Sequence, residues 1–247
     1  MGPKYACSSV GLFKGIAMAG VLYGIGVGPG DPKLLTIRAT EVLKCINVLV
    51  YPNFGDRKLS AHDIIKPFLV DGIVKLEMKI PFAPPKERLL AYNLNIVKIK
   101  EYLDQEFNVG VICEGDPLFF GSFINIWEPL KDKYKVEVIP GVSSVMSAFP
   151  EINEYIAIAD ESVSIITSNL TEELIMEKIR HSNTTIIMKI GKKFAKIRKI
   201  LEVMGLSKQA IYISNISRPN QMFSRIDLIS NMPEEYFSMI IIKNNDL

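Results

Sequence analysis

Two short segments of the sequence place Gly-Asp-Pro directly after an apolar run. They are VGPGDPKLL at 27–35 and CEGDPLFF at 113–120. Glycine has no Cβ and adopts unusual backbone angles, so glycine at a strand end lets a ligand approach the main chain closely. The glycine density is highest in GIGVGPG at 24–30. These turns are therefore candidates for a ligand site built mainly from backbone donors and acceptors.

The Asp-Pro pairs within these turns also have a purely structural explanation. Asp31 and Asp116 stand where helix N-cap residues belong. Pro32 and Pro117 follow at the first helical position, where a missing N–H costs nothing. Capping explains both pairs and predicts that each turn restarts a helix, but it does not explain the glycines.

Several common ligands of glycine-rich loops do not fit this sequence. A phosphate-binding loop needs Gly-Lys-Ser/Thr, whereas Gly30 precedes Asp31, whose charge would repel a phosphate. The dinucleotide fingerprint needs glycine where Pro29 stands, and an acid where the next run ends in 51–53 (Tyr-Pro-Asn). The G-x-G-x-G loop of common methyltransferases matches 24–28, but it expects the same missing acid. If the cofactor is S-adenosylmethionine, it must be held in another way.

Few side chains are placed to accept a proton near these turns. Glu114 ends one apolar run and Tyr51 ends another, so both are candidate catalytic residues, and water is an alternative base. His62 and His181 are the two histidines, and both lie in helical sequence contexts. We interpret them as surface residues.

The elements that must position these residues alternate between short apolar runs and longer segments of helical period. Strands are predicted at 21–27, 47–52, 73–80, 108–114 and 135–141, and then at 162–168, 184–190, 210–216 and 236–243. Helices are predicted at 33–45, 58–68, 85–105 and 118–131, and then at 171–181 and 192–204. This order predicts an α/β fold with a mainly parallel sheet, whose ligands gather at the carboxyl ends of the strands.

The pattern weakens between two such sets, which predicts two α/β domains. We expect an N-terminal domain at 21–142, a linker region at 143–160 and a C-terminal domain at 161–247. Residues 1–20 are expected to be a loosely attached extension. The binding site is expected in the cleft between the domains.

Composition narrows the class of protein. Lys and Arg number 29 against 27 Asp and Glu, a net charge of +2 that argues against a nucleic-acid partner. Cys7, Cys45 and Cys113 have neither disulfide nor zinc spacing, so we expect reduced thiols, no metal and a cytoplasmic protein. Lys14 interrupts the apolar N-terminal stretch, which argues against a membrane span.

As an ensemble, five segments carry a resemblance to a known family. They are VGPGDPKLLTIRATEVL at 27–43, CEGDPLFFGSF at 113–123, VIPGVSS at 138–144, IIMKIGKK at 186–193 and YFSMIII at 236–242. The chain resembles the tetrapyrrole methylases over about 21–243. Within this family, the motifs EGDPLFFGSF, MK-x-G and YFS, which occur in this order, resemble those of the precorrin-2 C-20 methyltransferase branch. The segment 148–158, which contains Pro150, departs from the family pattern, so the resemblance does not predict the linker and one wall of the substrate pocket.

The resemblance implies a homodimer that binds S-adenosylmethionine between two α/β domains and releases S-adenosylhomocysteine. By matching position, the cofactor-binding residues are Pro29, Gly115, Asp116, Phe119, Ser143, Ser144 and Met188. Without the resemblance, we would interpret Met188 as a core residue, and Ser143 and Ser144 as helix caps. The implied substrate is precorrin-2 or cobalt-precorrin-2, in the pathway of cobalamin biosynthesis.

A tetrapyrrole bearing many carboxylates needs cations around its site. We expect Lys189, Arg218 and Arg57 to bind the substrate, and the basic helix at 192–204 to be largely solvated. Two alternatives stay open. One is another methylase of this fold, acting on uroporphyrinogen, a later precorrin or RNA ribose, although the near-neutral charge argues against RNA. The other is a non-catalytic module that binds the cofactor.

Overall fold

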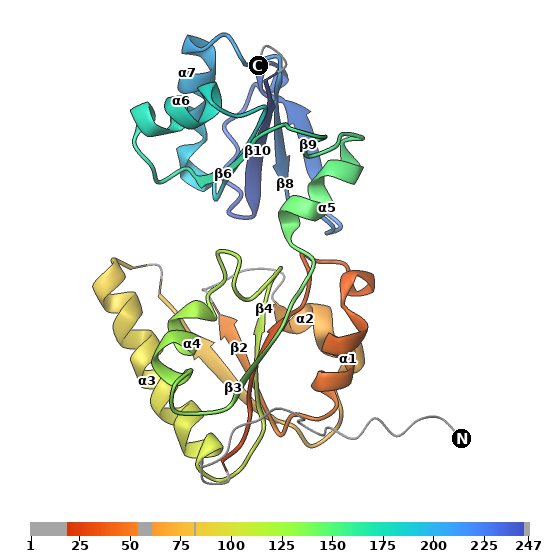
Figure 1. Ribbon diagram of the computed structural model, residues 1–247, viewed down its shortest axis with the longest axis vertical. Helices are drawn as coiled ribbons and strands as arrows, with labels where there is room; N and C mark the ends of the chain where they lie inside the picture. Colours follow the sequence, from red (N-terminus) through yellow and green to blue (C-terminus); the bar gives the residue numbers. More distant parts are fainter. Residues whose placement is uncertain (1–18, 54–60, 82, 245–247) are drawn as a thin grey trace. The chain divides into compact units, whose positions relative to one another are not determined.

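The computed structural model describes residues 19–53, 61–81 and 83–244. The chain divides into two compact units, of which unit 1 ends at Ser143 and unit 2 begins at Ser144. Figure 1 shows one sheet with its helices in each unit. The predicted α/β class with two sheets is confirmed. Residues 1–18, most of the expected extension, lie outside the described residues, and the linker at 143–160 stays a prediction.

Unit 1 contains a five-stranded parallel sheet. Its strands are β1 (Leu22–Gly26), β2 (Val48–Asn53), β3 (Val74–Lys79), β4 (Val109–Cys113) and β5 (Val136–Ile139). The strand order is β3-β2-β4-β1-β5, and all four neighbouring pairs are parallel. β1 therefore lies between β4 and β5, so the loops that follow these three strands leave the same edge of the sheet.

Helices cover both faces of this sheet. The helix α3 (Pro85–Leu103) and the helix α4 (Ile124–Leu130) pack against one face through a core that includes Ile99 and Ile126. The helices α1 (Ile37–Leu43) and α2 (Ala61–Ile65) pack against the other face through a second core. Strands buried on both faces explain the nearly continuous apolar runs of β1 and β4.

The two Asp-Pro turns lead into different structures. Asp31 caps a short 3-10 helix, η1 (Pro32–Leu34), by accepting a bond from the Lys33 amide at 2.9 Å. The predicted helix after Asp116 is wrong at its start, because residues 117–123 form turns and α4 begins at Ile124. Phe120 has a φ of 54°, which no α-helix accommodates.

Unit 2 contains a mixed sheet. Its strands are β6 (Val163–Thr167), β7 (Thr184–Met188), β8 (Ala210–Ser214), β9 (Met222–Arg225) and β10 (Ser238–Lys243). Their order is β6-β7-β10-β8-β9. β6 and β7 are parallel, whereas β10 is antiparallel to both β7 and β8. The edge strand β9 was missed because its four residues are mostly exposed and carry no buried run.

Three helices accompany this sheet. The helices α6 (Glu172–Arg180) and α7 (Phe194–Val203) share a core with the sheet, in which Phe194 packs edge-on against Tyr212 at 5.4 Å between ring centroids. The helix α5 (Ser144–Glu151) begins where Ser143 and Ser144 were candidate helix caps, and it includes Pro150 near its end. No helix in the described ranges is both long and apolar enough to cross a membrane.

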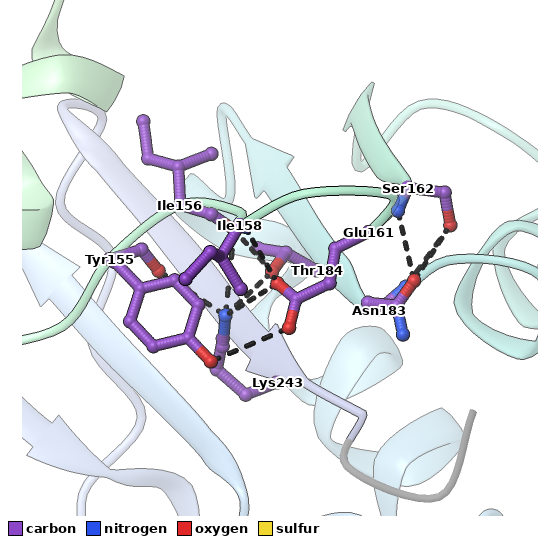
Figure 2. Close-up of polar contacts among 8 residues, drawn as sticks. All are labelled: Tyr155, Ile156, Ile158, Glu161, Ser162, Asn183, Thr184 and Lys243. Atoms are coloured by element: carbon purple, nitrogen blue, oxygen red, sulfur yellow. Dashed lines mark hydrogen bonds and ion pairs between the residues drawn. The ribbon is translucent and has the colours of Figure 1, made fainter.

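A lysine fastens the segment between α5 and β6 onto the sheet of unit 2 (Figure 2). The Nζ of Lys243 lies 3.3 Å from the Tyr155 carbonyl oxygen and 3.1 Å from the Thr184 hydroxyl oxygen. It also lies 3.9 Å from the centroid of the Tyr155 ring and 3.8 Å from the Glu161 carboxylate. The Lys243 side chain is only 15% exposed. We call this arrangement the lysine clasp.

Candidate functional site

Three glycines bring the loops after β1, β4 and β5 into backbone contact at the carboxyl edge of the unit 1 sheet. A Cβ on Gly141 would lie 2.1 Å from the Gly115 carbonyl oxygen, and one on Gly26 would lie 2.5 Å from the Gly141 nitrogen. Gly28 and Gly115 form an isolated bridge, in which the Gly115 amide donates to the Gly28 carbonyl at 2.8 Å. We call Gly26, Gly115 and Gly141 the glycine junction. Gly26 and Gly141 are required because no side chain fits between the loops, whereas Gly115 has a φ of 70°, which favours glycine.

Asp116 links two of these loops through its side chain. Its Oδ1 accepts from the Leu118 amide at 2.9 Å, which closes the turn after β4. Its Oδ2 accepts from the Gly141 amide at 3.0 Å, which ties this turn to the loop after β5. Both carboxylate oxygens therefore bond to the main chain. This second bond could not be inferred from the sequence, because the two residues are 25 positions apart.

The other predicted cofactor residues of unit 1 lie on the same loops. Pro29 is buried and follows β1, while Phe119 is half-buried and makes an edge-to-face contact with Phe120 at 5.1 Å. Ser143 is half-buried, and its Cα is the sole atom in the described structure within 4 Å of a Cβ built on Gly115. The structure thus brings Pro29, Gly115, Asp116, Phe119 and Ser143 to one edge of unit 1.

In unit 2, three other predicted residues share one edge of the sheet. Met188 ends β7, and Lys189 follows it with a φ of 58° and with its carbonyl oxygen accepting from the Ser168 hydroxyl at 2.6 Å. Arg218 follows β8, which runs parallel to β7 because both are antiparallel to β10. Ser144, the first residue of α5, also belongs to unit 2.

Arg218 is an unusual cation because it is only 8% exposed. Its guanidinium lies 4.4 Å from the centroid of the Phe237 ring. Phe237 precedes β10, and its carbonyl oxygen accepts from the Asn215 amide at 2.8 Å. An aromatic face stabilises a guanidinium that is partly removed from water. Phe237 was missed as a site residue, although it lies in YFSMIII, one of the five segments that carry the family resemblance.

The two candidate proton acceptors differ in their surroundings. Tyr51 lies in β2, with its ring centroid 5.0 Å from that of His62. Burial and then the Glu77 carboxylate raise the pKa of the Tyr51 phenol, which disfavours the phenolate that a base would need. Glu114 is half-buried directly after β4, between the buried Cys113 and Gly115. Glu114 is therefore the better placed of the two, and both assignments stay predictions.

His62 is not the plain surface residue that we expected. It is half-buried, and burial followed by Lys75 lowers the pKa of its imidazole. Its Nε2 is buried and has no hydrogen-bond partner within the described ranges. His181 is exposed, as expected, and its Nδ1 lies 2.8 Å from the Glu177 carbonyl oxygen.

Several other cations of the chain already have partners. The Arg38 guanidinium donates to Glu137 at 2.7 Å. In the basic helix, Lys196 donates to the carbonyl oxygen of Leu170 and Lys193 donates to Asn169. These two lysines of the basic helix therefore hold the loop after β6. Arg57 lies outside the described residues.

No cluster of potential metal ligands occurs in the parts of the chain that the structure covers. Cys45 and Cys113 are free thiols, and Cys7 lies outside the described residues. Cys113 is buried in β4, where burial raises the pKa of its thiol to about 11. This thiol is protonated at neutral pH and is part of the core.

Comparison with known proteins connects this geometry to a family. A model of the tetrapyrrole (corrin/porphyrin) methylases matches residues 21–228. A probable cobalt-precorrin-2 C(20)-methyltransferase of Methanocaldococcus jannaschii is 32% identical over 90% of this chain and 95% of its own length. A precorrin-2 C(20)-methyltransferase of Sinorhizobium is 26% identical, with coverage of 90% and 95%.

Among solved structures, the uroporphyrin-III C-methyltransferase of Thermus thermophilus in complex with S-adenosylhomocysteine has a TM-score of 0.65. It is 20% identical, and the similarity covers 91% of this chain and 98% of that one. At 20% identity, this similarity shows a shared fold and nothing about the activity of this chain. The resemblance drawn from the sequence motifs agrees with these matches.

Proposed function

The chain belongs to the tetrapyrrole methylase family, and from this premise we propose that it transfers a methyl group from S-adenosylmethionine to C-20 of precorrin-2 or cobalt-precorrin-2. The observation that carries the choice of acceptor is similarity over nearly the full length to two relatives with this printed activity. Motifs along the chain support it, because EGDPLFFGSF, MK-x-G and YFS occur in the order typical of this branch.

The residues of unit 1 fit an adenosyl cofactor held mainly by main chain. Gly115 has a φ of 70°, and a Cβ built on it would find only the Ser143 Cα, at 3.8 Å. The backbone is thus uncovered on this side of the glycine junction, next to the buried Pro29 and the half-buried Phe119. We assign cofactor binding to Pro29, Gly115 and Ser143 here, with Asp116 and Phe119 beside them. The roles of Ser144 and Met188, in unit 2, stay predictions.

Methyl transfer from a sulfonium requires few catalytic side chains. When bound, S-adenosylmethionine supplies a methyl group on a sulfonium, which is already an activated electrophile. The chain itself must contribute alignment of the acceptor carbon, exclusion of water and removal of a proton. Glu114 is our candidate for the last task, since it stands at the carboxyl edge of the sheet beside the glycine junction.

Lys189 and Arg218 are our candidates for binding substrate carboxylates. They lie at the same edge of the unit 2 sheet, and a guanidinium held against Phe237 is preorganised for a carboxylate. Replacing Arg218 by alanine would also remove packing on Phe237. Lysine keeps the charge but loses the planar fork, so Arg218→Lys is the better variant. The proposal expects it to weaken substrate binding while leaving cofactor binding unchanged.

One experiment separates this function from its alternatives. The chain is titrated with S-adenosylhomocysteine in a calorimeter and then incubated with ¹³C-methyl-labelled S-adenosylmethionine and precorrin-2, with and without cobalt. We expect binding, and a product heavier by one methyl group at C-20. Binding without turnover on either form would favour the non-catalytic module. Methylation of uroporphyrinogen or a later precorrin instead would favour another methylase of the family. The cytoplasmic location stays a prediction.

A further inference from the structure

The loop between β8 and β9 holds Arg218 by both of its backbone groups. The Arg218 amide donates to the Asn215 carbonyl oxygen at 3.0 Å, and the Arg218 carbonyl oxygen accepts from the Gln221 amide at 3.0 Å. The loop begins at Asn215, whose amide donates to the Phe237 carbonyl oxygen at 2.8 Å. The Arg218 guanidinium lies over the ring of the same Phe237. The place of Arg218 on this ring therefore depends on the path of the loop.

Two residues of this loop have backbone angles that are uncommon for side chains larger than glycine. Asn215 has a φ of 52° and Ser217 has a φ of 59°, both in the left-handed region. Asparagine tolerates this region better than serine does. Such angles persist only where the surrounding structure fixes them, and they are concentrated at functional sites. The conformation at Ser217 therefore requires a specific contact that holds it.

The side chain of Gln221 supplies this contact. Its Oε1 accepts from the Ser217 amide at 2.7 Å, and its Nε2 donates to the carboxylate of Glu151 at 2.8 Å. Glu151 is the last residue of α5, which lies beside β8 and β9 in Figure 1. The two partners fix the orientation of the Gln221 amide, because a backbone N–H only donates and a carboxylate only accepts. We call Glu151 and Gln221 the loop brace.

We propose that Gln221 is a positioning residue for Arg218, and that Glu151 keeps Gln221 in the orientation that this role requires. The inference rests on the proposed binding of substrate carboxylates by Arg218. A long side chain loses conformational freedom when it binds a ligand, and it loses less when its backbone and ring contacts are already fixed. The loop brace should therefore act on the affinity for the substrate and not on the methyl-transfer step.

The first test measures the exposure of Arg218 in the full chain and needs no substrate. Phenylglyoxal modifies accessible guanidinium groups, and mass spectrometry of peptides gives the rate at Arg218. Gln221→Glu places two carboxylates against each other, so it should release the loop and raise this rate at least about tenfold. Combining it with Glu151→Gln again pairs one amide with one carboxylate and should restore the slow rate. Asn220→Asp adds the same charge at an exposed position of the loop and should leave the rate unchanged.

The second test separates positioning from a purely structural role of the loop. The varied substrate is precorrin-2 or its cobalt form, whichever the unaltered chain methylates. Gln221→Glu should raise KM for this substrate at least about tenfold, while kcat stays within a few-fold and the affinity for S-adenosylhomocysteine is unchanged. The double exchange should bring KM back to the value of the unaltered chain.

The inference is overturned if Arg218 is modified equally fast in Gln221→Glu and Asn220→Asp, or if the double exchange is modified as fast as Gln221→Glu alone. It is also overturned if the modification rate rises but KM does not, because the brace would then hold the loop without serving the substrate. If the unaltered chain binds S-adenosylhomocysteine but methylates neither form of precorrin-2, the proposed function is wrong. The modification rates alone then decide whether Gln221 positions Arg218.

Discussion

At the scale of single residues, Asp31 and Asp116 show how one local sequence serves two purposes. Both precede proline, and both accept a bond from the amide two residues ahead at 2.9 Å. Only Asp116 also accepts from a distant loop, at the Gly141 amide. The first bond is a capping interaction that the local sequence predicts. The second joins the loops after β4 and β5 at the glycine junction.

Asp116→Asn should therefore damage the proposed cofactor site where Asp31→Asn does not. An amide can still accept from Leu118, but its NH₂ group cannot accept from Gly141. The loss of a bond to a charged acceptor is worth about 1.5–3 kcal/mol, so the affinity for S-adenosylhomocysteine should fall by about one to two orders of magnitude. Calorimetry on both variants measures this, and equal affinities would show that the bond to Gly141 does not matter for binding.

The choice between Glu114 and Tyr51 is also a question about single residues. Because general-base catalysis contributes about 10²–10⁴-fold, Glu114→Gln should slow single-turnover methylation by at least about 100-fold and leave cofactor affinity unchanged. Tyr51→Phe should stay within a few-fold of the unaltered rate, since the raised pKa of Tyr51 keeps its phenol neutral. Glu128→Gln, at an exposed ion pair of α4, is the control. An unchanged rate for Glu114→Gln would leave water as the base.

At the scale of elements, the lysine clasp holds in place a segment that has little regular structure of its own. The stretch between α5 and β6 contains no strand or helix, yet Lys243 at the end of β10 holds two of its carbonyl groups and one of its carboxylates. A partly buried ammonium ion with several acceptors is worth more than an exposed ion pair. The local order of this segment therefore depends on a residue nearly 90 positions away.

Lys243→Met should loosen this segment without unfolding unit 2. It keeps the aliphatic stem and removes the charge, and we expect a loss of about 1–3 kcal/mol in local opening free energy. Hydrogen exchange read by mass spectrometry should show faster exchange in 155–161, while β7 and β8 stay protected. Lys178→Met removes an exposed ion pair with Glu177 and should change nothing. Equal exchange in the two variants would contradict a role for the clasp.

At the scale of the whole molecule, the stability of unit 1 should fall at alkaline pH through Cys113. Burial raises the pKa of the Cys113 thiol in unit 1 from 9.0 to about 11, so the folded chain binds this proton more tightly than the unfolded chain. This contribution to stability is complete below about pH 9 and is lost as the pH rises to about 11. The difference corresponds to roughly 2–3 kcal/mol.

The single tryptophan of the sequence, Trp127, lies in α4 and so reports on unit 1. Urea unfolding followed by its fluorescence should show stability falling between pH 9 and 11. The decline should be less steep in Cys113→Ala, which is less stable at neutral pH because it leaves a small cavity. Identical pH slopes for the two proteins would show that Cys113 does not cause the decline.

The sequence by itself determined the α/β class, the nine strands with clear apolar runs, the cap at Asp31 and the family motifs. These features are local, because hydrophobic period and capping depend on residues within a few positions of each other. Only the tertiary structure decided that the loops after β1, β4 and β5 meet at the glycine junction, that Asp116 reaches Gly141, and that Arg218 lies on Phe237. Each of these contacts joins residues distant along the chain, and strand order fixes them after the sheets have formed. The same reason explains the missed strand β9, which is held by its pairing with β8 and not by any apolar pattern of its own.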